Sequence, residues 1–328
     1  MHVKQSRRSF LRELSGLCGA FPLRAVGRQS QRSPLRRVGF LIGDAPILIE
    51  AFKSEMRNLG YIEGQNLFID VRTASGPEVA RHATALAKAD LELVVAGALP
   101  FALEIRKADP ALPMVIATCP GMISNGFAKT LERPGGHVTG MEELPPGVTE
   151  KRLTLLKAAA PHVTRAALLS TTPGVGGHEA QVADAERTAK SLGVQVKAYR
   201  AANLDELKAA LDRIVQDRMN GLLNFQGGLS LANRQMIAEF AAVQRIPAIY
   251  QATMFAEAGG LMTWAPDLDK QYRIAASYVD QILKGAKAGD LPIRHPDRYF
   301  LTINARAAER IGLTLPADFI AAADRVLR

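Results

Sequence analysis

The residues best suited to holding a small molecule follow the predicted strands of the chain. Carboxyl ends of parallel strands meet along one edge of a sheet, where helix N-termini and free amides can bind a carboxylate. We therefore predict a ligand-binding site lined by residues at these strand ends. The candidates are Asp44, Ala98, Leu99, Cys119, Asn125, Thr171, Thr172, Gln226, Gln251, Trp264 and Asp267. Such groups can hold a solute, and none of them is placed to transform it.

Known catalytic and cofactor motifs are missing from the sequence. It has no G-x-S-x-G elbow for a serine nucleophile and no H-E-x-x-H spacing for a metal. The first predicted strand is followed by GDAP, which lacks the G-x-G-x-x-G pattern of a dinucleotide fold. Asp44 and Asp267 could act as a carboxylate pair, but nothing in the sequence requires them to meet. We expect no catalytic residue, no metal and no cofactor.

A glycine-rich loop, TTPGVGGHEA, covers residues 171–180 between a predicted strand and a predicted helix. Its backbone amides could hold an anion. The loop lacks the G-K-[ST] ending of a P-loop, so we do not expect a nucleoside triphosphate there. An ordinary strand-to-helix turn has the same composition, and both interpretations stay open.

Trp264 is the only tryptophan of the chain and lies in the stretch AEAGGLMTWAPDLDK, at the end of a predicted strand. The indole could pack in the core, or it could form a wall of the site and stack on the solute. Stacking would contribute about 1 kcal/mol beyond the buried area. We favour the wall, because the strand ends there and the chain then crosses between lobes.

Short apolar runs alternate with amphipathic helical stretches along most of the chain, which is typical of βαβ units in parallel sheets. Strands are predicted at 36–43, 67–73, 91–97 and 113–118, and again at 165–170, 194–200, 221–225, 247–251, 259–264 and 299–304. The segment between these groups, 133–150, is rich in glycine and proline, as expected of a crossing between lobes. The sequence therefore predicts two Rossmann-like α/β lobes with parallel sheets, joined by several crossings. The cleft between the lobes is the expected binding site.

We predict four segments along the chain. They are a leader at 1–37, a first lobe at 38–141, a second lobe at 142–265, and a segment at 266–328 that holds a crossing helix, the last strand and a helical tail. Part of this last segment is expected to return to the first lobe.

The positive charge of the chain is concentrated in its first 37 residues. They contain nine Lys or Arg and one acid, so eight of the nine net positive charges lie there and the rest is nearly neutral. The expected basic surface of a nucleic-acid-binding protein is therefore missing.

SRRSFLREL followed by a modest apolar stretch resembles a twin-arginine export signal, which predicts a periplasmic protein with cleavage between Ala20 and Arg37. The alternative is a disordered basic tail.

The two cysteines agree with this division of the chain. Cys18 lies in the leader, so Cys119 is alone in the remainder and no internal disulfide is expected. No other apolar run approaches the ~18 residues needed to span a membrane.

Several stretches resemble, in order, the substrate-binding proteins of bacterial ABC importers, in the group that includes tryptophan- and other amino-acid-binding members. They include LGYIEGQNLFIDVR, LERPGGHVTGM, KRLTLLKAAAP, EAGGLMTWAPD, AASYVDQILKGAKAGDLPI and FLTINARAAERIGLTLP. The resemblance covers 38–328. It implies a type I periplasmic-binding fold, closure of two lobes on one small solute and delivery to an ABC permease in the inner membrane. We expect a monomer.

Two departures from the family pattern concern the solute. The family commonly has Asp-Pro-Val after the fourth strand, where this chain has Gly121, Met122 and Ile123. An ammonium buried without a counter-charge would cost several kcal/mol, enough to cancel micromolar binding. Either Asp44 or Asp267 supplies that charge, or the solute is not a simple amino acid. The second departure is GGLMTWA in place of the family's GGLMSYG.

Three other functions are alternatives to transport. A module that reports a ligand to a sensor kinase or chemoreceptor would have the same sequence features. An enzyme on the same scaffold would need turnover that depends on Asp44 or Cys119. A DNA-binding regulator would need a helix-turn-helix ahead of the core, for which the leader has neither the length nor the apolar pattern.

Overall fold

The structure, a computed structural model, describes residues 35–171, 176–225 and 227–328, and of 176–178 the backbone alone. Most of the predicted leader lies outside this range. The first strand starts at Arg36, two residues before the predicted start of the first lobe at Val38. The Arg36 guanidinium forms an ion pair of 2.7 Å with Glu92 and a hydrogen bond to the Leu283 carbonyl, so this half-buried residue belongs to the folded part of the chain.

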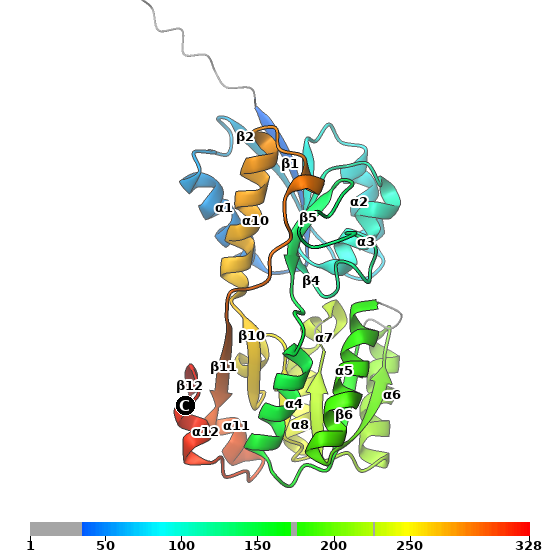
Figure 1. Ribbon diagram of the computed structural model, residues 1–328, viewed down its shortest axis with the longest axis vertical. Coiled ribbons are helices and arrows are strands. Elements are labelled where there is room, and N and C mark those ends of the chain that lie inside the picture. The colour runs from blue at the N-terminus through cyan, green and yellow to red at the C-terminus, as the bar shows by residue number, and fades with distance from the viewer. Residues whose placement is uncertain (1–34, 172–175, 226) are drawn as a thin grey trace, which may run out of the picture. The chain divides into compact units, whose positions relative to one another are not determined.

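The first sheet has five parallel strands in the order β2-β1-β3-β4-β5 (Figure 1). They are β1 (Arg36–Ile42), β2 (Leu67–Thr73), β3 (Leu93–Ala96), β4 (Met114–Cys119) and β5 (Val138–Glu142). One face packs against α1 (Pro46–Asn58) and α10 (Leu268–Leu283), and the other against α2 (Glu78–Ala87) and α3 (Leu99–Ala108). Burial on both faces explains why these strands are continuously apolar.

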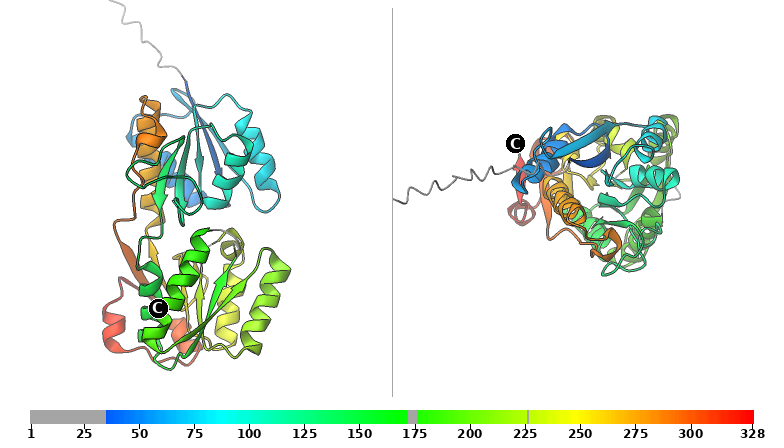
Figure 2. Two further views of the ribbon diagram at one scale, coloured as in Figure 1. Left: turned by 45° about the vertical axis from the view of Figure 1, so that its right-hand side comes forward. Right: turned by 90° about the horizontal axis from the view of Figure 1, so that it is seen from above.

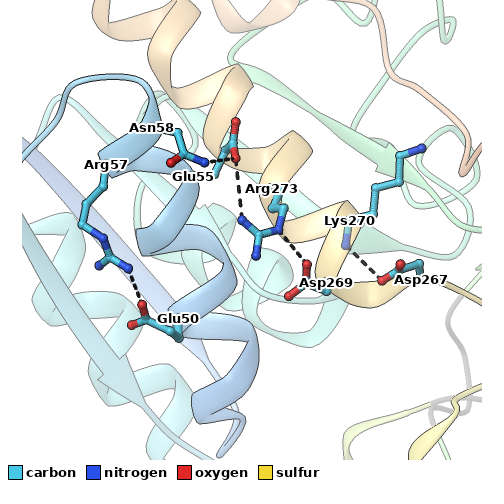
Figure 3. Close-up of polar contacts among 8 residues, drawn as sticks. All are labelled: Glu50, Glu55, Arg57, Asn58, Asp267, Asp269, Lys270 and Arg273. Carbon is cyan, nitrogen blue, oxygen red and sulfur yellow. Dashed lines mark hydrogen bonds and ion pairs between the residues drawn. The ribbon is translucent and has the colours of Figure 1, made fainter.

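Helix α10 reaches the first sheet from a distant part of the sequence. The Tyr272 hydroxyl donates to the Gly97 carbonyl at 2.7 Å. Arg273 forms ion pairs with Asp269 of its own helix and with Glu55 of α1, at 2.7 and 3.7 Å (Figure 3). These contacts and the apolar face shared with α1 hold α10 in the layer of the first sheet.

The second sheet has seven strands in the order β12-β11-β10-β9-β8-β6-β7, with helices on both of its faces (Figure 2). The strands are β6 (Arg165–Ser170), β7 (Gln195–Arg200), β8 (Gly221–Asn224), β9 (Ala248–Tyr250), β10 (Met262–Pro266), β11 (Tyr299–Asn304) and β12 (Arg325–Leu327). The longer helices are α4 (Val148–Ala159), α5 (Gly176–Leu192), α6 (Leu204–Gln216) and α8 (Arg234–Val243). Shorter ones are α7 (Gly228–Ala232), α9 (Met254–Glu257), α11 (Ala305–Arg310), α12 (Ala317–Ala321) and a 3₁₀ turn, η1 (Ala288–Asp290).

The predicted class, two α/β sheets dominated by parallel strands, is confirmed, with one antiparallel pair. Strand β11 runs antiparallel to β10. The reason is the path of the chain: β10 leads out of the second sheet toward α10, and β11 brings the chain back. The predicted helical tail contains the short strand β12, while α9 and α11 lie where no element was predicted.

Three crossings connect the layers of the two sheets. The first follows β5 at residues 143–147, the second passes through Asp267, and the third covers 291–298. The third crossing runs beside β5, because the Arg294 amide donates to the Gly140 carbonyl and the Glu142 amide donates to the Arg294 carbonyl. No helix in the described residues is long and apolar enough to cross a membrane.

Gly140 allows the close approach of β5 to β4. Its φ is +147°, and a Cβ atom there would lie 2.1 Å from the Ile116 carbonyl oxygen.

We expect Gly140→Ala to lower the free energy of unfolding by more than about 3 kcal/mol, because backbone rather than a side chain must move. Gly76→Ala is the matched control, since Gly76 also has a positive φ but nothing within 4 Å, and it should cost about 1 kcal/mol. Urea unfolding followed by circular dichroism measures both, and equal losses would contradict the packing argument.

Candidate functional site

Three of the predicted site residues lie just beyond strands β1 and β3, and a fourth follows β10. Asp44 follows β1 and is exposed. Ala98 and Leu99 start α3, where Ala98 is the N-cap and half-buried, while the Leu99 side chain is buried in the core. Asp267, from the second crossing, is the N-cap of α10 and accepts a hydrogen bond from the Lys270 amide at 3.1 Å (Figure 3). Asp267 therefore has a structural role at the start of α10, and the carboxylate pair of Asp44 and Asp267 considered from the sequence stays a prediction.

Cys119 ends β4 with its side chain fully buried among apolar neighbours. Burial, and the nearby carboxylates of Glu142 and Glu143, raise the pKa of the thiol well above its usual value. The thiol is therefore neutral at physiological pH and packs as a small hydrophobic group.

The loop after β4 is held in place by a carboxylate that the sequence did not point to. Glu142, at the end of β5, accepts hydrogen bonds from the amides of Gly121, Met122 and Leu144, at 2.8, 2.6 and 3.0 Å. Burial raises the pKa of Glu142, and these three donors oppose that rise. Asn125, a predicted site residue, donates its side-chain amide to the Gly121 carbonyl at 2.7 Å, so its side chain also shapes this loop.

In the second sheet, Thr171 and Gln251 are both buried at strand ends. Gln251 donates its amide to the Gln181 side-chain oxygen of α5. The Thr171 hydroxyl has no hydrogen-bond partner within the described part of the chain. Thr172 and Gln226 lie outside the described residues.

A row of buried polar side chains crosses the second sheet beside these residues. Asn224 of β8 is in register with Tyr250 of β9, which is in register with Thr263 of β10. Their side-chain polar atoms are buried, and no described residue offers them a hydrogen bond. Such groups normally bind water or a ligand. These three residues were not predicted as site residues, because a single polar residue in an apolar run looks like part of an ordinary buried strand.

The Trp264 indole is half-buried and stacks on Tyr299 of β11, with ring centroids 4.6 Å apart. The indole also packs against the core between the second sheet and α4 and α5. One face of the indole ring is therefore covered by Tyr299, the first residue of β11 after the third crossing.

Five residues form what we term the hinge cluster, in which all three crossings meet: Glu143, Arg152, Trp264, Gln271 and Tyr299. Arg152 of α4 donates from Nε to the Trp264 carbonyl at 3.0 Å. The Tyr299 hydroxyl donates to the Glu143 carbonyl at 2.6 Å. The side chains of Arg152 and Gln271 are almost fully buried, at 2% and 1% exposure.

The hinge cluster contains two buried opposite charges. Burial raises the pKa of Glu143 to about 7, an effect that the nearby Arg152 guanidinium partly offsets. Burial likewise lowers the pKa of Arg152 to about 10, against the opposing effect of Tyr299 and Glu143. For both groups the loss of hydration outweighs the attraction between them.

Two hollows lie near the crossings. A groove of about 670 Å³ has walls from α4 and α5 and includes Leu144, Glu150 and Arg187, but none of the predicted site residues. A cavity of about 50 Å³ at the second and third crossings is lined by Asp267, Gln271 and Phe300, among others. Among the described residues, no group of three or more His, Cys, Asp or Glu could hold a metal ion.

Removing Arg152 should make stability depend strongly on pH. Arg152→Ala leaves Glu143 buried without its cation, so we expect the free energy of unfolding to fall by about 3–5 kcal/mol at pH 8.5. The loss should be smaller at pH 5.5, where Glu143 binds a proton. Urea denaturation at both pH values measures this. Arg310→Ala, which breaks an exposed ion pair with Glu239, is the control and should change little. A loss of the same size at both pH values would argue against a titrating Glu143.

Glu143→Gln tests the same charge in the presence of Arg152. The pKa of Glu143 is raised from about 4.5, so its contribution to stability is full below that pH and is lost as pH rises through about 7. Glu143→Gln should therefore flatten the stability curve between pH 4.5 and 7. If the free energy of unfolding of the parent protein does not change between pH 4.5 and 7, the raised pKa of Glu143 is ruled out.

Comparison with known proteins identifies the family. A family model described as ABC transporter substrate binding protein matches residues 44–327. A tyrosine-binding protein of Clostridioides difficile (strain R20291) is 23% identical over 274 residues, covering 83% of this chain and 78% of the relative. An ABC domain in complex with L-Trp from Streptococcus pneumonia has a TM-score of 0.82 at 22% identity, covering 89% of this chain and 100% of that one. A conserved domain protein of Vibrio cholerae has a TM-score of 0.83 at 23% identity, with coverage of 90% and 100%.

The solved structures share the two-sheet architecture, which is the type I periplasmic-binding-protein fold. The family model extends from Asp44, in the turn after β1, to Leu327, the last residue of β12. The chain therefore belongs to the ABC transporter substrate-binding protein family.

Proposed function

We propose that this protein captures one small solute between the carboxyl edges of its two sheets and delivers it to the permease of an ABC importer. Membership of the family supports capture of a solute. The observation that carries the proposal is the set of neutral polar side chains at the strand ends of the second sheet, including Thr171 and Gln251. These groups offer hydrogen bonds to a solute and contain no nucleophile or general base.

The proposed solute is an amino acid or a related carboxylate or amide. One relative is named a tyrosine-binding protein, and another was solved in complex with L-Trp. An amino-acid solute needs a counter-charge for its ammonium. This chain has no acidic side chain at 121–123, and the nearby Glu142 carboxylate already accepts hydrogen bonds from three backbone amides. Asp267 caps α10, which leaves Asp44 as the exposed carboxylate at the edge of the first sheet. We assign Asp44 to the ammonium of an amino-acid solute.

The proposed place of action is the periplasm. The arginine pair of SRRSFLREL, in a leader with a net charge of +8, supports export by the twin-arginine route. A leader of this kind is removed after export, and the folded part starts close to its predicted end, since β1 begins at Arg36.

Isothermal titration calorimetry tests solute capture. We expect one-to-one binding with a micromolar Kd for at least one member of a panel of L-tyrosine, L-tryptophan, their amides and their des-amino acids. Asp44→Asn should weaken binding about tenfold or more for solutes with an ammonium, which is about 1.4 kcal/mol. It should leave the des-amino acids unchanged. Asp212→Asn on the exposed face of α6 is the matched control. Equal effects on both solute classes would remove Asp44 from the site, and a panel without any binding would refute an amino-acid-like solute.

Trp264 should report the same event, because it is the only tryptophan and lies in the hinge cluster. We expect a bound solute to change the tryptophan emission of the parent protein. Trp264→Phe should abolish that emission while the calorimetric Kd changes less than tenfold. A bound solute that leaves the parent spectrum unchanged would show that the indole surroundings do not move.

A further inference from the structure

Gln181 is a polar residue on the apolar face of α5. It lies one helical turn before Ala185, and Ala185 and Ala189 pack in the core between α5 and the second sheet. The Gln181 side chain is only 1% exposed, so its amide has been removed from water almost completely. A buried amide is costly unless both its oxygen and its nitrogen are hydrogen-bonded.

The oxygen and the nitrogen of this amide have different surroundings. The Gln181 Oε1 atom accepts a hydrogen bond from Nε2 of Gln251, whereas Nε2 of Gln181 has no partner in the described part of the chain. Because Gln251 binds the oxygen, the orientation of the Gln181 amide is fixed, and the group left to bind another molecule is a donor. A donor recognises an acceptor, such as the oxygen of a carboxylate or a carbonyl.

This donor lies at the carboxyl edge of the second sheet, on the face that α5 covers. Met262 of β10 is in register with Ile249 of β9, and both side chains pack in the core of that face. Side chains alternate along a strand, so Gln251 and Trp264, each two residues further along the chain, belong to the same face. The hydrogen bond from Gln251 therefore places the Gln181 amide beside the strand ends where the solute site is proposed.

The position of Gln181 in its helix favours a negatively charged acceptor. Helix α5 starts at Gly176, and the side chains of a helix lean toward its N-terminus, where the helix dipole favours an anion. Glu179, the acidic residue of the first turn, forms an ion pair of 2.7 Å with Arg200, so its charge is compensated. A hydrogen bond from a buried amide to a charged group also contributes more than one to a neutral group.

We propose that Nε2 of Gln181 binds the carboxylate of the solute, and that Gln251 positions it for this role. The inference rests on the proposed function and deepens it, since it assigns the solute a carboxylate that is held by the second sheet. Asp44, at the edge of the first sheet, is the proposed partner of the ammonium. An amino acid is then bound through its two charged groups by residues of different sheets, and a solute that lacks the carboxylate loses the contact with Gln181.

Calorimetry with matched solutes tests the assignment. L-tyrosine and L-tryptophan are compared with tyramine and tryptamine, which keep the ring and the ammonium but lack the carboxylate. Gln181→Met removes the donor with little change in side-chain volume. It should weaken binding of the amino acids about tenfold or more and leave the Kd of the amines nearly unchanged. Gln216→Met, on the exposed face of α6, is the matched control and should change neither.

Gln251→Leu tests the positioning role. Without the hydrogen bond from Gln251, the Gln181 amide is free to turn, so the preference for amino acids over amines should fall. A purely structural role of Gln251 would instead weaken the binding of both solute classes by the same factor.

Nuclear magnetic resonance on the parent protein provides a second route in case Gln181→Met is poorly folded, which thermal unfolding would reveal. The side-chain amide protons of Gln181 should move downfield when a binding amino acid saturates the protein, as expected of a donor to a carboxylate. Unchanged amide signals would overturn the assignment, as would equal weakening of amino acids and amines by Gln181→Met. Both failures leave solute capture standing, because the parent still binds. A parent that binds none of these solutes refutes the proposed amino-acid solute, and this assignment with it.

Discussion

The contacts between the three crossings are the constraint on which the two-sheet arrangement depends. Arg152 of α4 binds the Trp264 carbonyl, Tyr299 binds the backbone carbonyl of Glu143, and the rings of Trp264 and Tyr299 stack. These contacts join segments that are far apart in the sequence. Burial raises the pKa of Glu143 and lowers that of Arg152, so both groups lose more by leaving water than their surroundings return.

The two sheets themselves are stable for simpler reasons. Their strands are apolar and covered by helices on both faces. The helices pack through apolar faces whose periodic spacing can be recognised in the sequence. Such rigid layers joined by thin crossings can move as bodies. The polar groups belong to two sets. One set lies at strand ends and faces a solute in our proposal, and the other connects the crossings. Glu142 and Glu143 are consecutive residues where the first crossing leaves β5.

Local sequence patterns predicted most of the fold. The strands at 67–73, 165–170 and 299–304 have the predicted bounds, because an apolar run bounded by turn residues is a local signal. Strand β12 lies in the predicted helical tail, since its three residues, one exposed and two half-buried, have no strand pattern. The antiparallel direction of β11 follows from a path that returns through the first layer. The family was identified from ordered stretches spread along the chain, and the family model confirms it.

The site was harder to predict, because its contacts join residues far apart in the sequence. Nothing local distinguishes Arg152 from the exposed arginines of other amphipathic helices, yet its side chain is buried and contacts the Trp264 carbonyl. Glu142 reads as the end of a strand, and only the register of β5 brings it to the Gly121 amide. Cys119 was placed in the site because it ends a strand, whereas its side chain packs fully buried in the core of the first sheet.

The most direct test of the account is a calorimetric titration with L-tyrosine and L-tryptophan and with their des-amino acids. The account predicts that at least one amino acid binds one-to-one, and that Asp44→Asn weakens its binding about tenfold without affecting the des-amino acid. Absence of binding by either amino acid, or an equal effect of Asp44→Asn on both solute classes, would contradict it.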